Sequence, residues 1–201
     1  MTSNGHKKER ARLNRKDFFT PEQFQIFIDA CPRWLASFSR FASLTAMRPG
    51  EIRELRRGAV ILKANIIHDG QEFGLINLSA AETKSGRDET VLLLPAAREI
   101  LQGLPASINH PGLFFLGHKA RPITKGSLRH YFEAARRKSG LEVARPHMLR
   151  HTAVSWLIQR GVPLAFVQQI VRHRNYQTTL GYTHFLPQHL AGAMTALVRS
   201  A

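Results

Sequence analysis

One short segment, "RPHMLRHT", carries three side chains that could bind an anion and move a proton. It places His147, Arg150 and His151 at positions i, i+3 and i+4, a spacing that puts side chains on one face of a helix. The free N–H groups of a helix start, together with an arginine fork, bind phosphate oxygens, and histidine supplies a tunable proton. The segment therefore predicts either a phosphate site at a helix start or a solvated basic helix end.

The same two histidines could instead hold zinc, because ligands at i and i+4 meet on one helix face. The metalloprotease pattern requires a glutamate directly after the first histidine, whereas Met148 stands there. Cys31 is the only cysteine of the chain, which excludes both a disulfide framework and a four-thiolate metal site. We therefore expect no metal site.

Three further segments carry candidates that are weak when taken one at a time. In "TAMRPGEIREL", Arg48 and Glu51 stand three apart at a helix start, as an ordinary surface ion pair also would. In "ETKSGRDE", Lys84 lies at a hairpin tip, where lysine usually only solubilises a turn. Tyr182 follows His173 by nine positions, and a tyrosine near a helix end usually packs its ring and hydrogen-bonds its hydroxyl.

The composition indicates a polyanionic partner. The 201 residues include 29 Lys and Arg against 14 Asp and Glu, a formal net charge of +15. Self-repulsion of this size favours nucleic acid as the usual partner, and RNA stays open because phosphate attraction is indifferent to sequence. We expect no membrane partner, because no long basic amphipathic helix is evident. Lacking an apolar run of about 18 residues and a secretory signal, the sequence predicts a cytoplasmic, reducing setting.

Two segments concentrate the positive charge. Residues 1–17 form a basic arm that has almost no apolar residues and is predicted to be disordered. A second concentration lies between Arg129 and Arg150. A solvated face would explain either segment, but the net charge favours phosphate contacts. The candidate DNA-binding residues are Lys7, Lys8, Arg10, Arg12, Arg15, Lys16, Arg129, Arg136, Arg137 and Lys138.

The elements that must position these residues are mostly helical. Thr20-Pro21 predicts a helix start with an N-cap followed by proline at the first position. Three short β-rich runs, separated by Asp69-Gly70 and Ser85-Gly86, predict a small antiparallel sheet. The fold class is therefore mostly α with a small antiparallel β-sheet (α+β), as one domain over residues 18–201. Beyond the first helix, we expect helices near 32–47, 49–55, 96–103, 124–138, 146–160, 163–172 and 187–199.

The candidates gain weight from their order along the chain. They stand in the series Arg48, Lys84, His147 with Arg150, His173 and Tyr182. Together with the blocks "RPGEIREL", "TKSGRDETVLLLP", "PHMLRHT" and "TTLGYTH", over about residues 20–190, this series resembles the catalytic layout of the tyrosine recombinases, also called the phage integrase family. The resemblance implies the catalytic-domain fold of that family and site-specific DNA recombination. The compact layout most resembles the short, single-domain inversion recombinases that switch fimbrial genes.

The resemblance also implies how the strand would be cut. Tyr182 would attack the scissile phosphate, form a 3′-phosphotyrosyl bond and release a 5′-hydroxyl. The bond energy stays in the protein link, so neither a metal nor a nucleotide or other cofactor is needed. Arg48 and Arg150 would bind the non-bridging oxygens with planar guanidinium forks. Lys84 would protonate the leaving 5′-oxygen from its hairpin.

The other members of the series would assist. His147 would help to remove the proton of Tyr182, because an ordinary tyrosine pKa of about 10 makes a poor nucleophile at neutral pH. His173 would hydrogen-bond the phosphate. Glu51 would orient Arg48 or the hairpin of Lys84 rather than react.

Three departures from the family pattern have consequences. Leu-Gly commonly precedes the histidine at 173, whereas this chain has Val171-Arg172; we expect Arg172 to strain the turn by about 1 kcal/mol or to alter the path of His173. Arg57 and Ala59 replace a common tryptophan and aspartate, which affects the support of the site rather than its chemistry. Only the basic arm precedes the catalytic part, so we expect no N-terminal core-binding domain here, either because the protein naturally lacks one or because the chain is a fragment.

The expected partner is a double-stranded DNA recombination site. Because strand exchange needs two sites held together, the resemblance implies a homotetramer on DNA, formed from a protein that is monomeric in free solution. DNA-bending proteins are candidate accessories, and the location would be the nucleoid within the cytoplasm. The tail that follows Tyr182 could dock on a neighbouring subunit or pack on its own domain.

Two alternative functions stay open at this stage. One is a DNA-binding accessory or regulatory protein that keeps the recombinase fold with little cleavage activity. Arg172 and the expected lack of a core-binding domain suggest it. The other is a topoisomerase that relaxes supercoils with similar chemistry.

Overall fold

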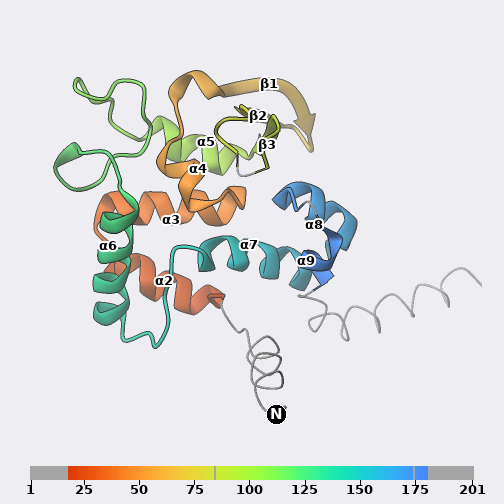
Figure 1. Ribbon diagram of the computed structural model, residues 1–201. Coiled ribbons are helices and arrows are strands. Elements are labelled where there is room, and N and C mark those ends of the chain that lie inside the picture. Colours follow the sequence, from red (N-terminus) through yellow and green to blue (C-terminus); the bar gives the residue numbers. More distant parts are fainter. Residues whose placement is uncertain (1–17, 84, 174, 181–201) are drawn as a thin grey trace, which may run out of the picture.

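Helices and one small sheet alternate along the chain in the computed structural model, which describes residues 18–83, 85–173 and 175–180 (Figure 1). The helices are α2 Pro21–Ala30, α3 Arg33–Thr45, α4 Pro49–Arg53, α5 Pro95–Gln102, α6 Lys125–Ser139, α7 Met148–Gln159, α8 Leu164–Val171 and α9 Tyr176–Leu180. The strands are β1 Val60–His68, β2 Gln71–Leu78 and β3 Glu89–Leu93, and the short 3-10 turns are η1 Arg57–Ala59 and η2 His118–Ala120. The predicted class, mostly helical with a small antiparallel sheet, is confirmed. The helix predicted at 187–199 lies outside the described residues.

Local side-chain chemistry explains where the helices begin and end. The hydroxyl of Thr20 accepts from the N–H of Gln23, whose side chain returns a bond to the backbone of Thr20, so α2 begins with the predicted cap. Thr124 and Ser127 form the same arrangement at the start of α6. Gly140 ends α6 in the left-handed conformation, at φ 69°, which only glycine adopts without strain.

The sheet has the order β1-β2-β3, with both neighbouring pairs antiparallel. The turn between β1 and β2 is Asp69-Gly70, with φ of 49° and 72°, the left-handed pair that a tight hairpin requires. The register of β1 shifts between Ile61 and Ile66. Gly74 of β2 faces this bulge, where an added Cβ would lie 2.4 Å from the carbonyl oxygen of Ile61. A larger residue at position 74 would therefore push β1 off the sheet.

Two apolar cores hold the helices together. The larger core joins α2, α3, α5 and α6 to the inner face of the sheet. The smaller core lies between the end of α3, α7 and α8, and it consists of Ala46, Ala153, Val154, Ile158, Val167 and Val171. In Figure 1, α3 and α7 run side by side through the middle of the molecule, with α8 and α9 beyond the end of α7. The smaller core therefore carries the segments that hold three candidate site residues, at 48, 150 and 173.

Two long-range hydrogen bonds fix the segment that precedes α2. The N–H of Phe19 donates to the hydroxyl of Thr152 at 2.9 Å, and the indole N–H of Trp156 donates to the carbonyl of Phe19 at 3.0 Å. The start of the described chain is thereby fastened to α7. None of the described helices is both long enough and apolar enough to cross a bilayer.

Candidate anion-binding site

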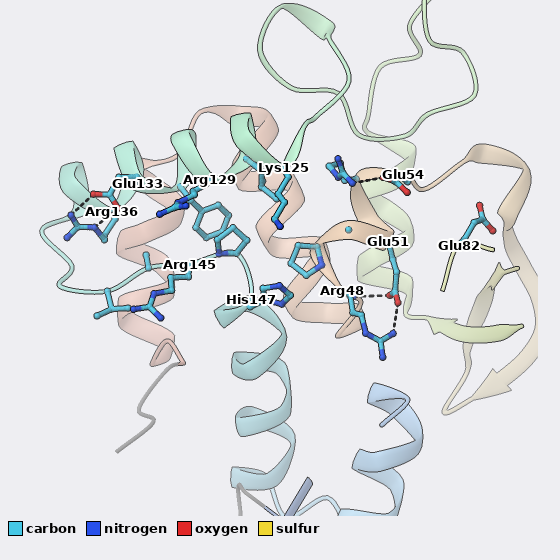
Figure 2. Close-up of a pocket in the computed structure, with 18 of the residues that line it drawn as sticks. Arg48, Glu51, Glu54, Glu82, Lys125, Arg129, Glu133, Arg136, Arg145 and His147 are labelled. Carbon is cyan, nitrogen blue, oxygen red and sulfur yellow. Dashed lines mark hydrogen bonds and ion pairs between the residues drawn. The ribbon is translucent and has the colours of Figure 1, made fainter. Parts of the chain in front are cut away.

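A pocket of about 970 Å³ lies where the start of α4, one face of α6 and the segment before α7 meet (Figure 2). Arg48 lines it from α4, and His147 lines it from the position just before α7. Lys125 and Arg129, spaced i and i+4 on α6, line the same pocket. The fold therefore brings two of the predicted site residues to one cavity from distant parts of the sequence.

The wall of this pocket carries both signs of charge, but the carboxylates are largely paired. Glu133 accepts from the Nε and Nη2 of Arg136 at 2.9 and 2.6 Å. Lys125, Arg129 and Arg145 make no ion pair within the described part of the chain. These three side chains are therefore the cations of the wall that are best placed to meet an anion from solution.

Arg48 is the first residue of a rigid local unit. It caps α4 in an extended conformation, followed by proline at the first helical position. Its backbone N–H donates to Oε2 of Glu51 at 2.9 Å, and its Nη1 donates to Oε1 of Glu51 at 2.6 Å. The Arg48 side chain is 22% exposed, whereas that of Glu51 is only 3% exposed. Glu51 therefore holds Arg48 from inside while the guanidinium keeps access to the pocket.

Arg172 joins the same unit from the far side, which was not predicted. Its Nη2 lies 2.6 Å from Oε2 of Glu51, and its Nη1 lies 2.5 Å from Oε2 of Glu89 on β3. Nη1 of Arg48 lies 3.7 Å from the same oxygen of Glu89. Burial acts to raise the pKa of Glu51, but the charge and hydrogen bonds of Arg172, with those of Arg48, outweigh it and hold this pKa below its usual value. Two arginines and two carboxylates thus form one nearly buried network.

The backbone at Arg172 explains how its side chain reaches the network. Arg172 ends α8 in the left-handed conformation, at φ 56° and ψ 46°. The N–H of His173 donates to the carbonyl of Gln168 at 3.1 Å and that of Arg172 donates to Gln169 at 3.1 Å, the pattern of a Schellman helix end. The predicted strain at this turn is consistent with a left-handed residue that carries a side chain. The two ion pairs offset that strain.

Arg150 is buried, with the whole residue 7% exposed, and it ties two segments together. Its Nη1 donates to the carbonyl of Ala46 at 2.7 Å, and its Nη2 donates to the carbonyl of Val171. Ala46 precedes Arg48 by two positions, and Val171 is the last residue of α8. Arg150 therefore holds the segments of Arg48 and of residue 173 against each other.

The predicted common face of "RPHMLRHT" is only partly observed. The helix begins at Met148, two positions later than predicted, so His147 is its cap rather than part of its first turn. His147 lines the pocket, whereas Arg150 turns inward to the two carbonyls. His151 donates its backbone N–H to the carbonyl of His147 at 3.3 Å and does not line the pocket. Tertiary contacts, not the helical spacing alone, decide which of these side chains faces the cavity.

His173 is held in a neutral state. Burial, as the largest cause, and the positive charges of Arg150, Arg48 and His151 together lower its pKa from 6.5 to about 4. Its Nδ1 lies 3.0 Å from the hydroxyl oxygen of Thr179 on α9. This pKa also shows that Arg150, Arg48 and His173 share one electrostatic environment.

Several predicted site residues lie outside the described residues. These are Lys84, Tyr182 and the arm residues Lys7, Lys8, Arg10, Arg12, Arg15 and Lys16. The loop on both sides of position 84 is held by its own polar groups. The hydroxyl of Thr83 donates to the carbonyl of Arg87 at 2.7 Å, and the N–H of Ala80 donates to Oδ1 of Asp88 at 2.7 Å.

The four predicted DNA-binding residues of α6 separate into two pairs. Arg129 and Arg136 line the pocket, whereas Arg137 and Lys138 are exposed and do not line it. Nε of Arg137 lies 3.6 Å from the carboxylate of Glu133. The sequence prediction missed Lys125 and Arg145, which line the pocket. The i, i+4 spacing of Lys125 with Arg129 was the signal that could have identified the first of them.

The donor set of this site suits an anion rather than a metal. Within the described ranges, no group of three or more His, Cys, Asp or Glu side chains is arranged to hold a metal ion. Six guanidinium and ammonium groups and one imidazole line the pocket, against five carboxylates, of which Glu51, Glu54 and Glu133 are paired with arginines. The fold and the site thus define an α+β domain that presents a positively charged, partly buried site to a phosphate-like ligand.

This chain belongs to the phage integrase family, because the model of that family matches residues 17–189. Tyrosine recombinase XerD of Brucella abortus biovar 1 (strain 9-941) is 37% identical over 118 residues, which cover 53% of this chain and 38% of that protein. The integrase of Salmonella phage P22 is 27% identical over 184 residues, covering 85% of this chain and 44% of that protein. The chain therefore spans less than half the length of these relatives.

Solved structures show the same fold. The XerH site-specific recombinase bound to palindromic difH substrate, in a post-cleavage complex, matches with a TM-score of 0.62 and 22% identity over 89% of this chain and 52% of that one. The catalytic domain of bacteriophage HP1 integrase matches with a TM-score of 0.61 and 20% identity over 89% of this chain and 93% of that one.

Proposed function

We propose that this protein is a site-specific DNA recombinase that cuts and rejoins DNA strands through a 3′-phosphotyrosyl intermediate at Tyr182. The observation that carries the proposal is the convergence of Arg48 at the start of α4, His147 and Arg150 at the start of α7, and His173 just after α8. Arg48 and His147 line one pocket, and Arg150 fastens the segments of Arg48 and His173 together. Membership of the phage integrase family supports the same conclusion. In this proposal, residues 18–201 form the catalytic domain.

The site would stabilise charge that develops on the phosphate. Arg48 and Arg150 provide permanent positive charge for the non-bridging oxygens of a pentavalent transition state. Arg48 is held by Glu51 at the pocket before DNA arrives, and Arg150, whose Nη atoms donate to two backbone carbonyls, contributes its fixed positive charge beside it. Preorganised donors of this kind are each worth about 2.7–4 kcal/mol of barrier lowering.

His173 would act as a neutral hydrogen-bond donor. Its low pKa keeps the ring uncharged at neutral pH. When the hydroxyl of Thr179 donates to Nδ1, across the observed 3.0 Å, the ring proton lies on Nε2. Nε2 can then donate that proton in a hydrogen bond to a phosphate oxygen without transferring it.

The remaining residues would supply the two proton transfers that the cleavage step requires. The Tyr182 oxygen forms a bond to phosphorus, and its proton passes to His147. The bond from phosphorus to the 5′-oxygen breaks, and Lys84 gives that oxygen a proton. The 5′-hydroxyl of a partner strand reverses these steps on the phosphotyrosyl bond, so neither a nucleotide nor a metal is consumed.

The wider assembly is part of the same proposal. The substrate would be a double-stranded DNA recombination site, bound by the pocket wall and by the basic residues of the arm. Strand exchange between two sites implies four subunits on DNA, and DNA-bending proteins could assist them. The product at the nucleoid would be an inversion, as in fimbrial switching, an excision or an integration.

A suicide substrate tests the proposal directly. Nicked duplexes built from inverted repeats beside the gene should trap the wild-type protein as a covalent adduct that survives denaturing electrophoresis. Tyr182→Phe should bind the same DNA and trap nothing, because it lacks the attacking oxygen. Equal trapping by Tyr182→Phe would refute the assignment of the nucleophile. Relaxation of a supercoiled plasmid that lacks such repeats would favour a topoisomerase instead.

A further inference from the structure

We propose that Arg172 is a positioning residue that sequesters Glu89 from Arg48, and so keeps Arg48 available for an anionic phosphate. This inference rests on the proposed function and assigns a role to a residue that departs from the common family pattern. It concerns an interaction that joins three elements, since α4, β3 and the end of α8 each contribute a member.

The distances show how the carboxylates are shared. Glu51 binds Arg48 and Arg172 at 2.6 Å each, one through each oxygen. Glu89 lies 2.5 Å from Nη1 of Arg172 but 3.7 Å from Nη1 of Arg48, both measured to the same oxygen. Arg172 is therefore the nearer partner of Glu89, and Arg48 keeps a looser contact on that side.

The charges show what this sharing does. Arg48, Arg172, Glu51 and Glu89 together carry no net formal charge. Without Arg172 the remaining three groups would carry one net negative charge, and Glu89 would have Arg48 as its nearest cation in this set. A carboxylate so placed competes with phosphate for the Arg48 guanidinium and repels the phosphate as well. Arg172 removes both effects, because its side chain is only 8% exposed and its two Nη atoms each bind one of the carboxylates.

The backbone conformation at position 172 allows the role of the Arg172 side chain to be tested without disturbing the turn. Arg172 is left-handed, at φ 56°, and directly precedes His173. Glycine would suit that conformation better, so Arg172→Gly should fold with the turn intact while the whole side chain, guanidinium included, is removed. The variant separates the role of the side chain from that of the turn.

The experiment compares covalent adduct formation on the suicide substrate by the wild type and four variants. We expect Arg172→Gly to lower the maximal rate constant of adduct formation about tenfold, the effect of roughly one unbalanced charge near the site, while the DNA concentration that gives half of that maximum changes little. Adding Glu89→Gln to Arg172→Gly restores the charge balance and should recover most of the rate constant. Arg172→Lys keeps the charge and should stay within about threefold of wild type. Arg160→Ala, which removes an exposed cation at the end of α7, is the control for general loss of charge.

The outcomes decide the inference in either direction. Recovery by the double variant supports it, because a merely structural role of Arg172 would not be repaired by neutralising a second side chain of the network. Failure of Glu89→Gln to recover the rate constant of adduct formation would overturn it. A faster Arg172→Gly would overturn it too, and would favour an accessory protein whose cleavage Arg172 suppresses.

A second measurement keeps this inference separate from the proposed function. If the wild-type protein forms no adduct with any flanking repeat, the proposed function fails, and the network is then tested with inorganic phosphate. Phosphate should raise the melting temperature of the wild type and of the Arg172→Gly, Glu89→Gln double variant. About tenfold more phosphate should be needed for the same rise in Arg172→Gly. Equal protection of wild type and Arg172→Gly, including none in either, would overturn the inference.

Discussion

Replacing Glu51 by glutamine removes the charge from the most buried carboxylate of the site while keeping its shape. Glu51 is 3% exposed and accepts from the N–H and Nη1 of Arg48 at 2.9 and 2.6 Å and from Nη2 of Arg172 at 2.6 Å. Removing one partner of a buried ion pair costs about 3–5 kcal/mol, because the other charge is left uncompensated. Glu89 still pairs with Arg172, so we expect the lower limit, about 3 kcal/mol. For a chain of this size that is a fall of roughly 6–12 °C in Tm.

Urea unfolding followed by circular dichroism at pH 7 measures this loss, and Glu54→Gln is the matched control. Glu54 pairs with Arg53 at 2.5 Å, yet its side chain is 63% exposed, so its loss should cost less than about 0.5 kcal/mol. The pH dependence of the free energy of unfolding provides a second test of the role of Glu51. Because the pKa of Glu51 is lowered by folding, its contribution is present above its ordinary pKa and is lost as the pH falls through the folded value. If Glu51→Gln and Glu54→Gln lose equal stability, the Glu51 network does not hold the site together.

Three further predictions follow from the geometry. His173 has a folded pKa of about 4 against an ordinary 6.5, so stability should fall by up to about 3 kcal/mol as the pH drops from 6.5 to 4, and His173→Gln should lose this dependence in parallel urea titrations. Arg150→Lys keeps the charge but not the fork that reaches two carbonyls, so we expect about 100-fold slower adduct formation and a loss of roughly 1–2 kcal/mol; unchanged stability would contradict the second part. Lys125→Ala and Arg145→Ala should each flatten the plot of log DNA affinity against log salt by about 0.9, whereas an unchanged slope would place DNA elsewhere.

The sequence predicted most of the elements because their boundaries are set locally. Thr20 and Thr124 cap helices through side chains three residues away, and Asp69-Gly70 makes the turn that its conformational freedom favours. The segment from 49 to 55 was wrong in length, since the helix there ends at Arg53. The bulge in β1 was not predicted, because it depends on how closely the strand crosses Gly74.

The site was harder to predict than the elements. Family order identified Arg48, His147, Arg150 and His173, and the structure brings them together. The partners of these residues could not be read from spacing, because Glu89 and Arg172 are far apart in sequence and meet only through the packing of α8 against the rest. Arg172 in particular suggested strain at a helix end. It does adopt the left-handed backbone, but nothing local indicates that its side chain would reach two carboxylates.

The two carbonyl contacts of Arg150 limit how inactive variants of this protein can be interpreted. A mutant that lacks Arg150 loses the two hydrogen bonds that join the end of α3 to the end of α8, and it also loses the positive charge proposed to bind phosphate. A loss of function in a cell could then come from a lower amount of folded protein or from a lower catalytic rate. In genetic screens for strand exchange, substitutions at position 150 should therefore lower the amount of folded protein as often as they lower its activity. Under the proposed function, a dominant-negative allele, which must persist and occupy its DNA without cutting it, is better sought at Tyr182 than at Arg150.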